Sequence, residues 1–176
     1  QFYIVFPIFL FLIHKFFQKR YALFIGLVAI FSFALSAWSV TSHASASFYL
    51  APTRAWELLL GSLLAIGILP APSSRLLSEV LSFTGAALIG YAIFFFDYAT
   101  PFPGPAALLP CFGATLIIFA NKNSDNAVKK ALSWKPMVGI GLISYSLYLW
   151  HWPLLVFGRY VASEPLSLLS TAGLIT

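Results

Sequence analysis

Long runs of apolar residues, separated by short polar connections, limit what this chain can fold into. The runs lie at about 2–17, 21–40, 54–69, 80–96, 106–120, 137–157 and 165–176. A helix needs about 20 mostly apolar residues to cross a bilayer, and flanking residues can extend the shorter runs. Only 9% of the residues are charged, against about 25% in soluble domains. The sequence therefore predicts an all-α, polytopic transmembrane helix bundle of about seven spans, the last one truncated.

The basic residues are distributed unevenly between the two sets of connections. Eight of the ten lysine and arginine residues lie at 14–20, 70–79 and 121–136, whereas the alternate connections carry only Arg54 and Arg159. Loops rich in lysine and arginine stay on the cytoplasmic side of a membrane. We therefore expect the first set of loops to be cytoplasmic. The net charge of +5 is explained by these loops, so we expect the lipid bilayer as a partner and no nucleic acid.

The stretch APTRAWELLLGSLLA, residues 51–65, has the pattern of a helix that begins near the outer face. Pro52 and Thr53 are typical of a helix start, and we expect Thr53 to be the N-cap. Arg54 and Glu57 then fall in the first turns, where a carboxylate suits the positive end of the helix dipole.

Arg54 and Glu57 share a helical stripe with two small residues, Gly61 and Ala65. Small residues let a second helix approach closely, so we expect this stripe to face the bundle interior. A guanidinium offers a planar fork of donors to a carboxylate, a phosphate or a developing oxyanion. The alternative is an ion pair of purely structural value, three residues apart on one helix.

A histidine and a proline interrupt the apolar run at 137–157, in the string SYSLYLWHWPLLVF. Pro153 has no N–H, so it should free the carbonyl of Leu149 and kink the helix beside His151. Such a kink can open a polar pocket. The residues that share or border the histidine face are Ser144, Tyr145, Tyr148 and Trp152. The alternative is a histidine hydrogen-bonded at the headgroup level within an aromatic belt, and the residues alone favour neither reading.

Several polar residues are predicted to lie at one depth, toward the outer face. They are Gln1, Tyr3, Arg54, Glu57 and His151. Polar side chains at membrane depth usually face a cavity or one another, so the pattern predicts a site there. The alternative is interfacial anchoring. The sequence shows no metal-ligand spacing, P-loop or serine-nucleophile elbow, and we expect no metal.

Three strings resemble the membrane acyltransferase family 3: QFYIVFP at 1–7, RAWELLLGSLLA at 54–65 and IGLISYSLYLWHWPLLVF at 140–157. That family includes bacterial O-antigen acetylases and related exopolysaccharide and peptidoglycan O-acyltransferases. The resemblance implies a ten-helix domain of the bacterial inner membrane that moves an acyl group, usually acetyl, from acyl-CoA to a sugar hydroxyl. It implies no bound cofactor. Residues 1–176 would form one transmembrane domain fragment, equivalent to the C-terminal part.

The resemblance also implies roles for single residues. Arg54 would orient the thioester or the oxyanion, Glu57 would hold Arg54, and His151 would line the acceptor side. The remaining candidate substrate contacts are Gln1, Tyr3, Ser144, Tyr145, Tyr148 and Trp152.

QFY resembles the end of the family motif SLxxEEQFYxxxP. We therefore expect the first three helices and the catalytic base to be absent, and this fragment alone to be inactive. Many members carry a periplasmic SGNH-type domain, a further candidate partner. A membrane transporter and a non-catalytic structural membrane subunit are the alternatives.

Overall fold

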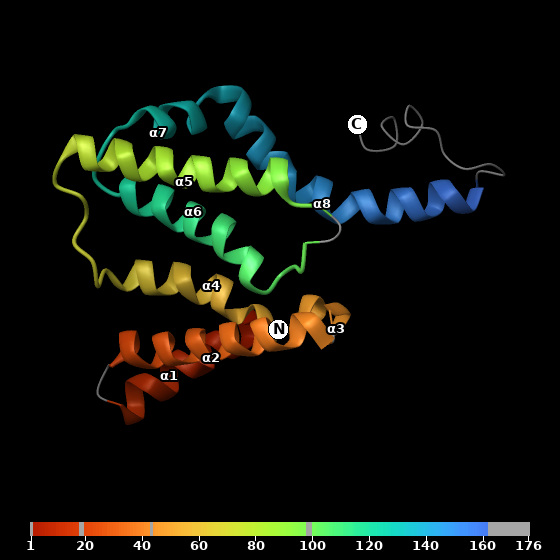
Figure 1. The fold of residues 1–176 in the computed structure, drawn as a ribbon, viewed down its shortest axis with the longest axis horizontal. Coiled ribbons are helices and arrows are strands. Elements are labelled where there is room, and N and C mark those ends of the chain that lie inside the picture. The colour runs from red at the N-terminus through yellow and green to blue at the C-terminus, as the bar shows by residue number, and fades with distance from the viewer. Residues whose placement is uncertain (1, 18–19, 43, 98–99, 162–176) are drawn as a thin grey trace. The chain divides into compact units, whose positions relative to one another are not determined.

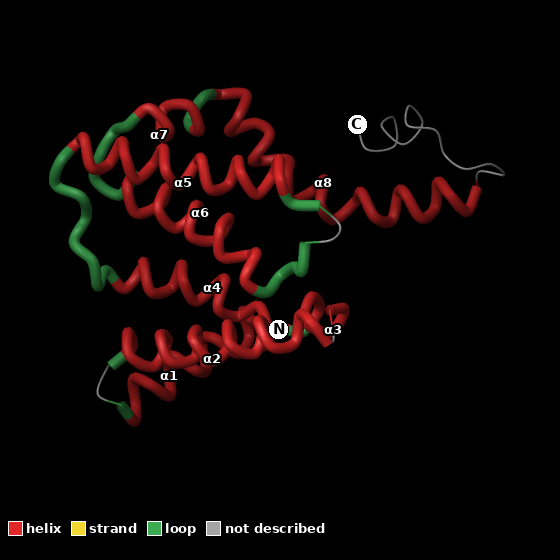
Figure 2. The backbone as a smooth tube through the Cα atoms, viewed as in Figure 1, coloured by secondary structure: helices red, strands yellow, loops and turns green. Residues whose placement is uncertain are grey.

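The computed structural model describes residues 2–17, 20–42, 44–97 and 100–161, and within these ranges every element is helical (Figure 2). The elements, in chain order (Figure 1), are α1 (Phe2–Phe16), α2 (Tyr21–Ser42), α3 (Ala44–Tyr49), α4 (Ala51–Ile66), α5 (Arg75–Phe95), a short 3-10 helix η1 (Pro105–Ala107), α6 (Leu108–Ala120), α7 (Ala127–Leu132) and α8 (Lys135–Val161). The chain divides into two compact units, Gln1–Val128 and Lys129–Thr176. The all-α prediction is confirmed for the described residues, and the single domain over 1–176 stays a prediction.

Among the described residues, three helices are long and apolar enough to cross a membrane: α2, α5 and the Lys135–Phe157 part of α8. Two shorter apolar helices cover Ile4–Phe16 and Pro105–Ala120. The span expected at 54–69 corresponds to α4, and the one expected at 165–176 lies outside the described residues. The count of seven spans therefore stays a prediction.

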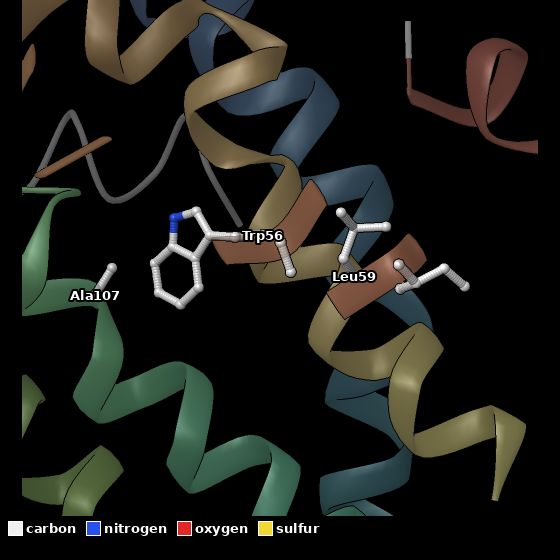
Figure 3. Packing of buried hydrophobic residues seen from close by; sticks show 5 residues of the cluster. Trp56, Leu59 and Ala107 are labelled. Carbon is white, nitrogen blue, oxygen red and sulfur yellow. The ribbon is translucent and has the colours of Figure 1, made fainter. Parts of the chain in front are cut away.

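The buried apolar cluster of the first unit lies where α2 and α4 pack together, next to Ala107. The buried face of α2 consists of Ile25, Ala29, Ser32, Ser36, Ser39 and Val40. Most of these side chains are small, so α4 can approach α2 closely. Trp56 of α4 is 2% exposed and meets Phe33 edge-on, with 5.1 Å between the ring centroids. Figure 3 shows Trp56 on α4, on the side of Ala107.

Helices α5 and α6 cross with their backbones in contact at Gly85 and Gly113. A Cβ atom on Gly85 would lie 2.5 Å from the carbonyl oxygen of Gly113. A Cβ atom on Gly113 would lie 2.7 Å from the carbonyl oxygen of Gly85. Real Cβ contacts are never this short, so this crossing requires glycine on both helices.

A buried amide joins α5 to the connection that follows α6. The Nδ2 atom of Asn126 lies 2.9 Å from Oγ of Ser78 and 2.7 Å from Oγ of Ser82. It also lies 2.5 Å from Oδ1 of Asn121. Asn126 is fully buried. Buried polar groups in folded proteins are nearly always hydrogen-bonded. The hydrogen bonds of Asn126 therefore fix this connection against α5.

The prediction that Thr53 is the N-cap of α4 is wrong. Leu50 is the N-cap, with an extended backbone, and Pro52 lies in the first turn. The fixed φ of proline suits the first turn of a helix, so the helix begins upstream of the threonine. Thr53 is buried inside the helix, and its Oγ1 donates to the carbonyl oxygens of Ser47 and Leu50, at 2.7 Å each.

The face of α4 that packs in the first unit also differs from the prediction. Thr53, Trp56 and Leu59 are buried, whereas Gly61 and Ala65 are exposed. A Cβ atom on Gly61 would meet nothing within 4 Å in the described part of the chain. Branched and aromatic side chains bury more apolar area than glycine and alanine, so the former set the face that α4 turns to its neighbours.

Candidate functional site

Arg54 and Glu57 form an ion pair across one turn of α4. Nη2 of Arg54 lies 2.9 Å from Oε2 of Glu57, and Nε lies 3.2 Å from Oε1. A contact through two guanidinium nitrogens fixes the plane of the guanidinium as well as its position. The side chain of Glu57 is 16% exposed and that of Arg54 is 40% exposed. The mostly buried carboxylate therefore orients a cation that is more accessible than itself.

Helix α3 supplies a second support for the guanidinium. The Cζ atom of Arg54 lies 5.2 Å from the centre of the Phe48 ring. Cation–π contacts of this length attract the cation to the ring face. The bonds from Thr53 to the backbone of residues 47 and 50 tie α3 to the start of α4. The sequence signal for the ion pair was local, whereas Phe48 becomes a neighbour only because α3 folds back on α4.

His151 is anchored to the backbone of its own helix, α8. Its Nδ1 lies 2.6 Å from the carbonyl oxygen of Tyr148 and 3.2 Å from that of Leu147. A carbonyl oxygen can only accept, so Nδ1 carries a proton. In the neutral ring, Nε2 then carries the lone pair and can accept a hydrogen bond from a hydroxyl. Figure 1 shows that α8 changes direction along its length, as expected for a helix that contains Pro153.

A hollow of about 160 Å³ lies along α8 beside His151. Its lining residues are Ile143, Ser146, Leu147, Trp150, His151 and Leu154. Ser146 and Trp150 are absent from the sequence-based candidates. Helical periodicity counted from His151 leads to Leu147 and Leu154, and that signal could have located the hollow.

The four α8 residues predicted to bind substrate are exposed. They are Ser144, Tyr145, Tyr148 and Trp152. Ser144 donates from Oγ to the carbonyl oxygen of Gly141 at 2.7 Å, and the Tyr148 ring centroid lies 5.7 Å from that of His151.

The structure brings Arg54 and Glu57 together in the first unit and His151 and Tyr148 together in the second. Gln1 lies outside the described residues, and only the helical backbone of Tyr3 is described. That Arg54 and His151 share one site stays a prediction.

The helices and the polar groups on them define a membrane protein with an oriented guanidinium and an anchored imidazole. The family model described as "Acyltransferase domain", of acyltransferase family 3, matches residues 1–175. The chain belongs to this family, which confirms the resemblance drawn from its sequence.

Curated relatives of this chain have names that refer to acetyl or acyl transfer. The chain is 31% identical over 168 residues to the O-acetyltransferase OatA of Staphylococcus aureus, a match that covers 89% of this chain and 28% of OatA. It is 29% identical over 178 residues to YrhL of Bacillus subtilis, provisionally named a peptidoglycan O-acetyltransferase, covering 92% of this chain and 27% of YrhL.

A third relative is BcsY of Komagataeibacter xylinus, provisionally named a membrane-bound transacylase. It is 31% identical over 140 residues, covering 77% of this chain and 34% of BcsY. The chain therefore spans about a third or less of the length of these relatives. No solved structure matches it significantly.

Proposed function

We propose that this chain is part of a membrane-bound O-acyltransferase that transfers an acetyl group from acetyl-CoA to a sugar hydroxyl of a cell-surface polysaccharide. The observation that carries the proposal is the Arg54–Glu57 pair, in which a mostly buried carboxylate orients a partly exposed guanidinium in a member of an acyltransferase family. The relatives named for O-acetylation support the acetyl group and the hydroxyl acceptor.

Arg54 acts on the acyl group in this proposal. The acceptor oxygen attacks the thioester carbonyl carbon, and the carbonyl oxygen becomes an oxyanion. Collapse of this intermediate breaks the carbon–sulfur bond and releases the CoA thiolate, which takes up the proton that the acceptor hydroxyl loses. Donors aimed at the carbonyl oxygen stabilise the transition state more than the ground state. The guanidinium of Arg54 remains charged at all physiological pH values and supplies such donors. Glu57 keeps the guanidinium in one orientation and prevents it from turning away.

His151 acts on the acceptor side. With Nδ1–H bonded to the carbonyl of Tyr148, Nε2 can accept a hydrogen bond from the sugar hydroxyl and relay its proton. Acyl transfer to an alcohol requires that this proton be removed as the oxygen attacks. Ser144, Tyr145, Tyr148 and Trp152 are the proposed contacts of the glycan on α8.

The same proposal includes the membrane topology. The basic loops at 14–20, 70–79 and 121–136 face the cytoplasm of a bacterial inner membrane, where acyl-CoA is available. The clustering of lysine and arginine in these loops supports this orientation. Gln1 and Tyr3 as substrate contacts, and an SGNH-type domain as a partner, stay predictions.

The test uses the full-length protein in membranes, with labelled acetyl-CoA and the isolated glycan. We expect Arg54→Ala and His151→Ala to abolish transfer of label, whereas membrane insertion is retained. Arg75→Ala is the matched control, because Arg75 is an exposed arginine whose Nε lies 4.0 Å from Glu79, a turn away. Label transfer at the normal rate in both variants would contradict the assignment. Movement of label across the membrane with no covalent product would favour the transporter.

A further inference from the structure

A serine of α2 reaches into the hydrogen-bond ladder of α4. The Ser32 hydroxyl donates to the carbonyl oxygen of Pro52 at 2.5 Å and accepts from the backbone N–H of Trp56 at 3.0 Å. Residues 52 and 56 are four apart, so an α-helix pairs this carbonyl with this N–H directly. The hydroxyl of Ser32 therefore bridges the two ends of one helical turn.

The bridged turn is the one that carries the candidate site. Arg54 lies between the two bridged residues, and Glu57 follows Trp56 directly. The hydroxyl bonds to both backbone groups of this turn, so it restrains the local course of the helix. The directions in which Arg54 and Glu57 leave the helix axis therefore depend on the Ser32 hydroxyl.

Ser32 differs from the other serines on the same face of α2. Ser36 is fully buried, and its Oγ has no hydrogen-bond partner among the residues that the structure describes. Ser39 donates to the carbonyl oxygen of Ser36, within its own helix. All three serines are small enough for close helix packing, so packing alone does not explain the bridge from Ser32. The first turn of α4 is thus held by Ser32 from α2 and, through Thr53, by the backbone of α3.

We propose that Ser32 is a positioning residue, whose hydroxyl fixes the turn of α4 that presents Arg54 and Glu57. Its consequence for catalysis rests on the proposed function, in which Arg54 faces the reacting carbonyl. The claim that Ser32 fixes this turn can be tested without an activity assay. It can therefore fail independently of the proposed role of Arg54 in catalysis.

The geometric test measures the reactivity of a thiol at position 54. The full-length protein is made without other cysteines, with Cys111→Ser, and carries Arg54→Cys as the reporter. Labelling by a maleimide is then timed in the parent, in Ser32→Ala and in Ser36→Ala. We expect Ser32→Ala to speed labelling at least about threefold, because a turn that loses its tertiary bonds opens more often. Ser36→Ala should match the parent. Equal rates in all three proteins would overturn the proposal.

The catalytic test measures kcat and KM with Arg54 in place. Loss of one net hydrogen bond corresponds to about a tenfold change, so we expect Ser32→Ala to lower kcat about tenfold with KM within twofold. Ser32→Thr keeps the hydroxyl and should retain more kcat than Ser32→Ala, and Ser36→Ala should leave kcat unchanged. A merely structural serine would lower the yield of folded protein and leave the kcat of that protein normal, and that result overturns the proposal.

The two tests can disagree, or Ser32→Ala can fail to fold. Faster labelling with normal kcat in Ser32→Ala supports the geometric role of the serine and contradicts the proposed role of Arg54. If Ser32→Ala does not fold, Ser32→Cys is measured in the kinetic test, because it keeps the shape with a weaker hydrogen-bonding group. Normal kcat in Ser32→Cys would then overturn the proposal, and a lowered kcat would support it.

Discussion

The Glu57 carboxylate holds the Arg54 guanidinium through two nitrogens, with Oε2 2.9 Å from Nη2 and Oε1 3.2 Å from Nε. Glu57 is the more buried partner, so its carboxylate determines the plane of the guanidinium. An arginine used to stabilise a developing oxyanion benefits from such an orienting group, because a donor that is already aligned does not have to reorganise during the reaction.

Replacing the charge of Glu57 should therefore lower catalysis with little effect on the amount of protein. We expect Glu57→Gln to lower kcat about tenfold to a hundredfold, since a lost charge-assisted bond contributes about 1.5–3 kcal/mol. Acetyl transfer by the full-length protein measures this. Glu57→Asp keeps the charge but moves it back along the side chain, and should retain more activity than Glu57→Gln. Equal activity of Glu57→Gln and wild type would remove Glu57 from the site.

The ring of Phe48 should contribute a smaller effect through the same cation. A cation–π contact at a partly exposed site is worth about 0.5–1 kcal/mol, so Phe48→Ala should lower kcat only about twofold to fivefold. Phe48→Tyr keeps an aromatic face and should be near wild type. Phe83→Ala, an exposed phenylalanine on α5, controls for general loss of aromatic surface. A Phe48→Ala variant no slower than Phe83→Ala would show that the ring does not act on Arg54.

Amide substitutions can distinguish the roles of the two ring nitrogens of His151. An asparagine amide mimics Nδ1 and a glutamine amide mimics Nε2, because the two side chains differ by one methylene. We expect His151→Asn to keep the bond to the Tyr148 carbonyl and to lose acetyl transfer as fully as His151→Ala. His151→Gln can accept the hydrogen bond of the acceptor hydroxyl but cannot take up its proton, so it should retain only the small transfer that positioning of the hydroxyl supports. The opposite order would assign the function of this histidine to the bond between Nδ1 and the helix.

The parts of this fold that were predictable from the sequence depend on local spacing. The apolar runs predicted the positions of the long helices, and the spacing of Arg54 and Glu57 predicted their contact, because residues three apart on a helix are neighbours. The N-cap of α4 was misplaced because Thr53 uses its hydroxyl on carbonyls of residues before it. These hydrogen-bond partners of Thr53 depend on where α3 lies, which cannot be inferred from the residue spacing along α4.

Contacts between distant segments were not predictable in this way. The Ser32 bridge joins residues 20 and 24 positions apart, and the bonds of Asn126 join residues up to 48 apart. A serine on an apolar helix is compatible with solvent, lipid or a neighbouring helix, and only the packed structure selects among them. The sequence therefore identified the charged members of the candidate site and missed the hydroxyl that holds their turn.

The buried amide of Asn126 should matter for stability more than for catalysis. Asn126→Leu removes the amide from which the hydroxyls of Ser78 and Ser82 accept hydrogen bonds, and each lost hydrogen bond costs about 0.5–1.5 kcal/mol. We expect a lower thermal unfolding midpoint in detergent, with kcat of the folded fraction unchanged. Asn123→Leu, at an exposed position of the same connection, is the matched control. Equal midpoints for the two variants would argue against the cluster as an anchor.

The glycine contact between α5 and α6 gives a stability prediction with an internal control. A Cβ atom at Gly85 would lie 2.5 Å from a backbone oxygen of α6, whereas one at Gly90 of the same helix would meet nothing within 4 Å. Gly85→Ala forces the helices apart, and overpacking of this kind costs about 1–3 kcal/mol. Gly90→Ala gains helix propensity of up to about 1 kcal/mol. The two variants should therefore move the unfolding midpoint in detergent in opposite directions. Gly85→Ala with an unchanged midpoint would mean that α5 and α6 do not cross at these glycines.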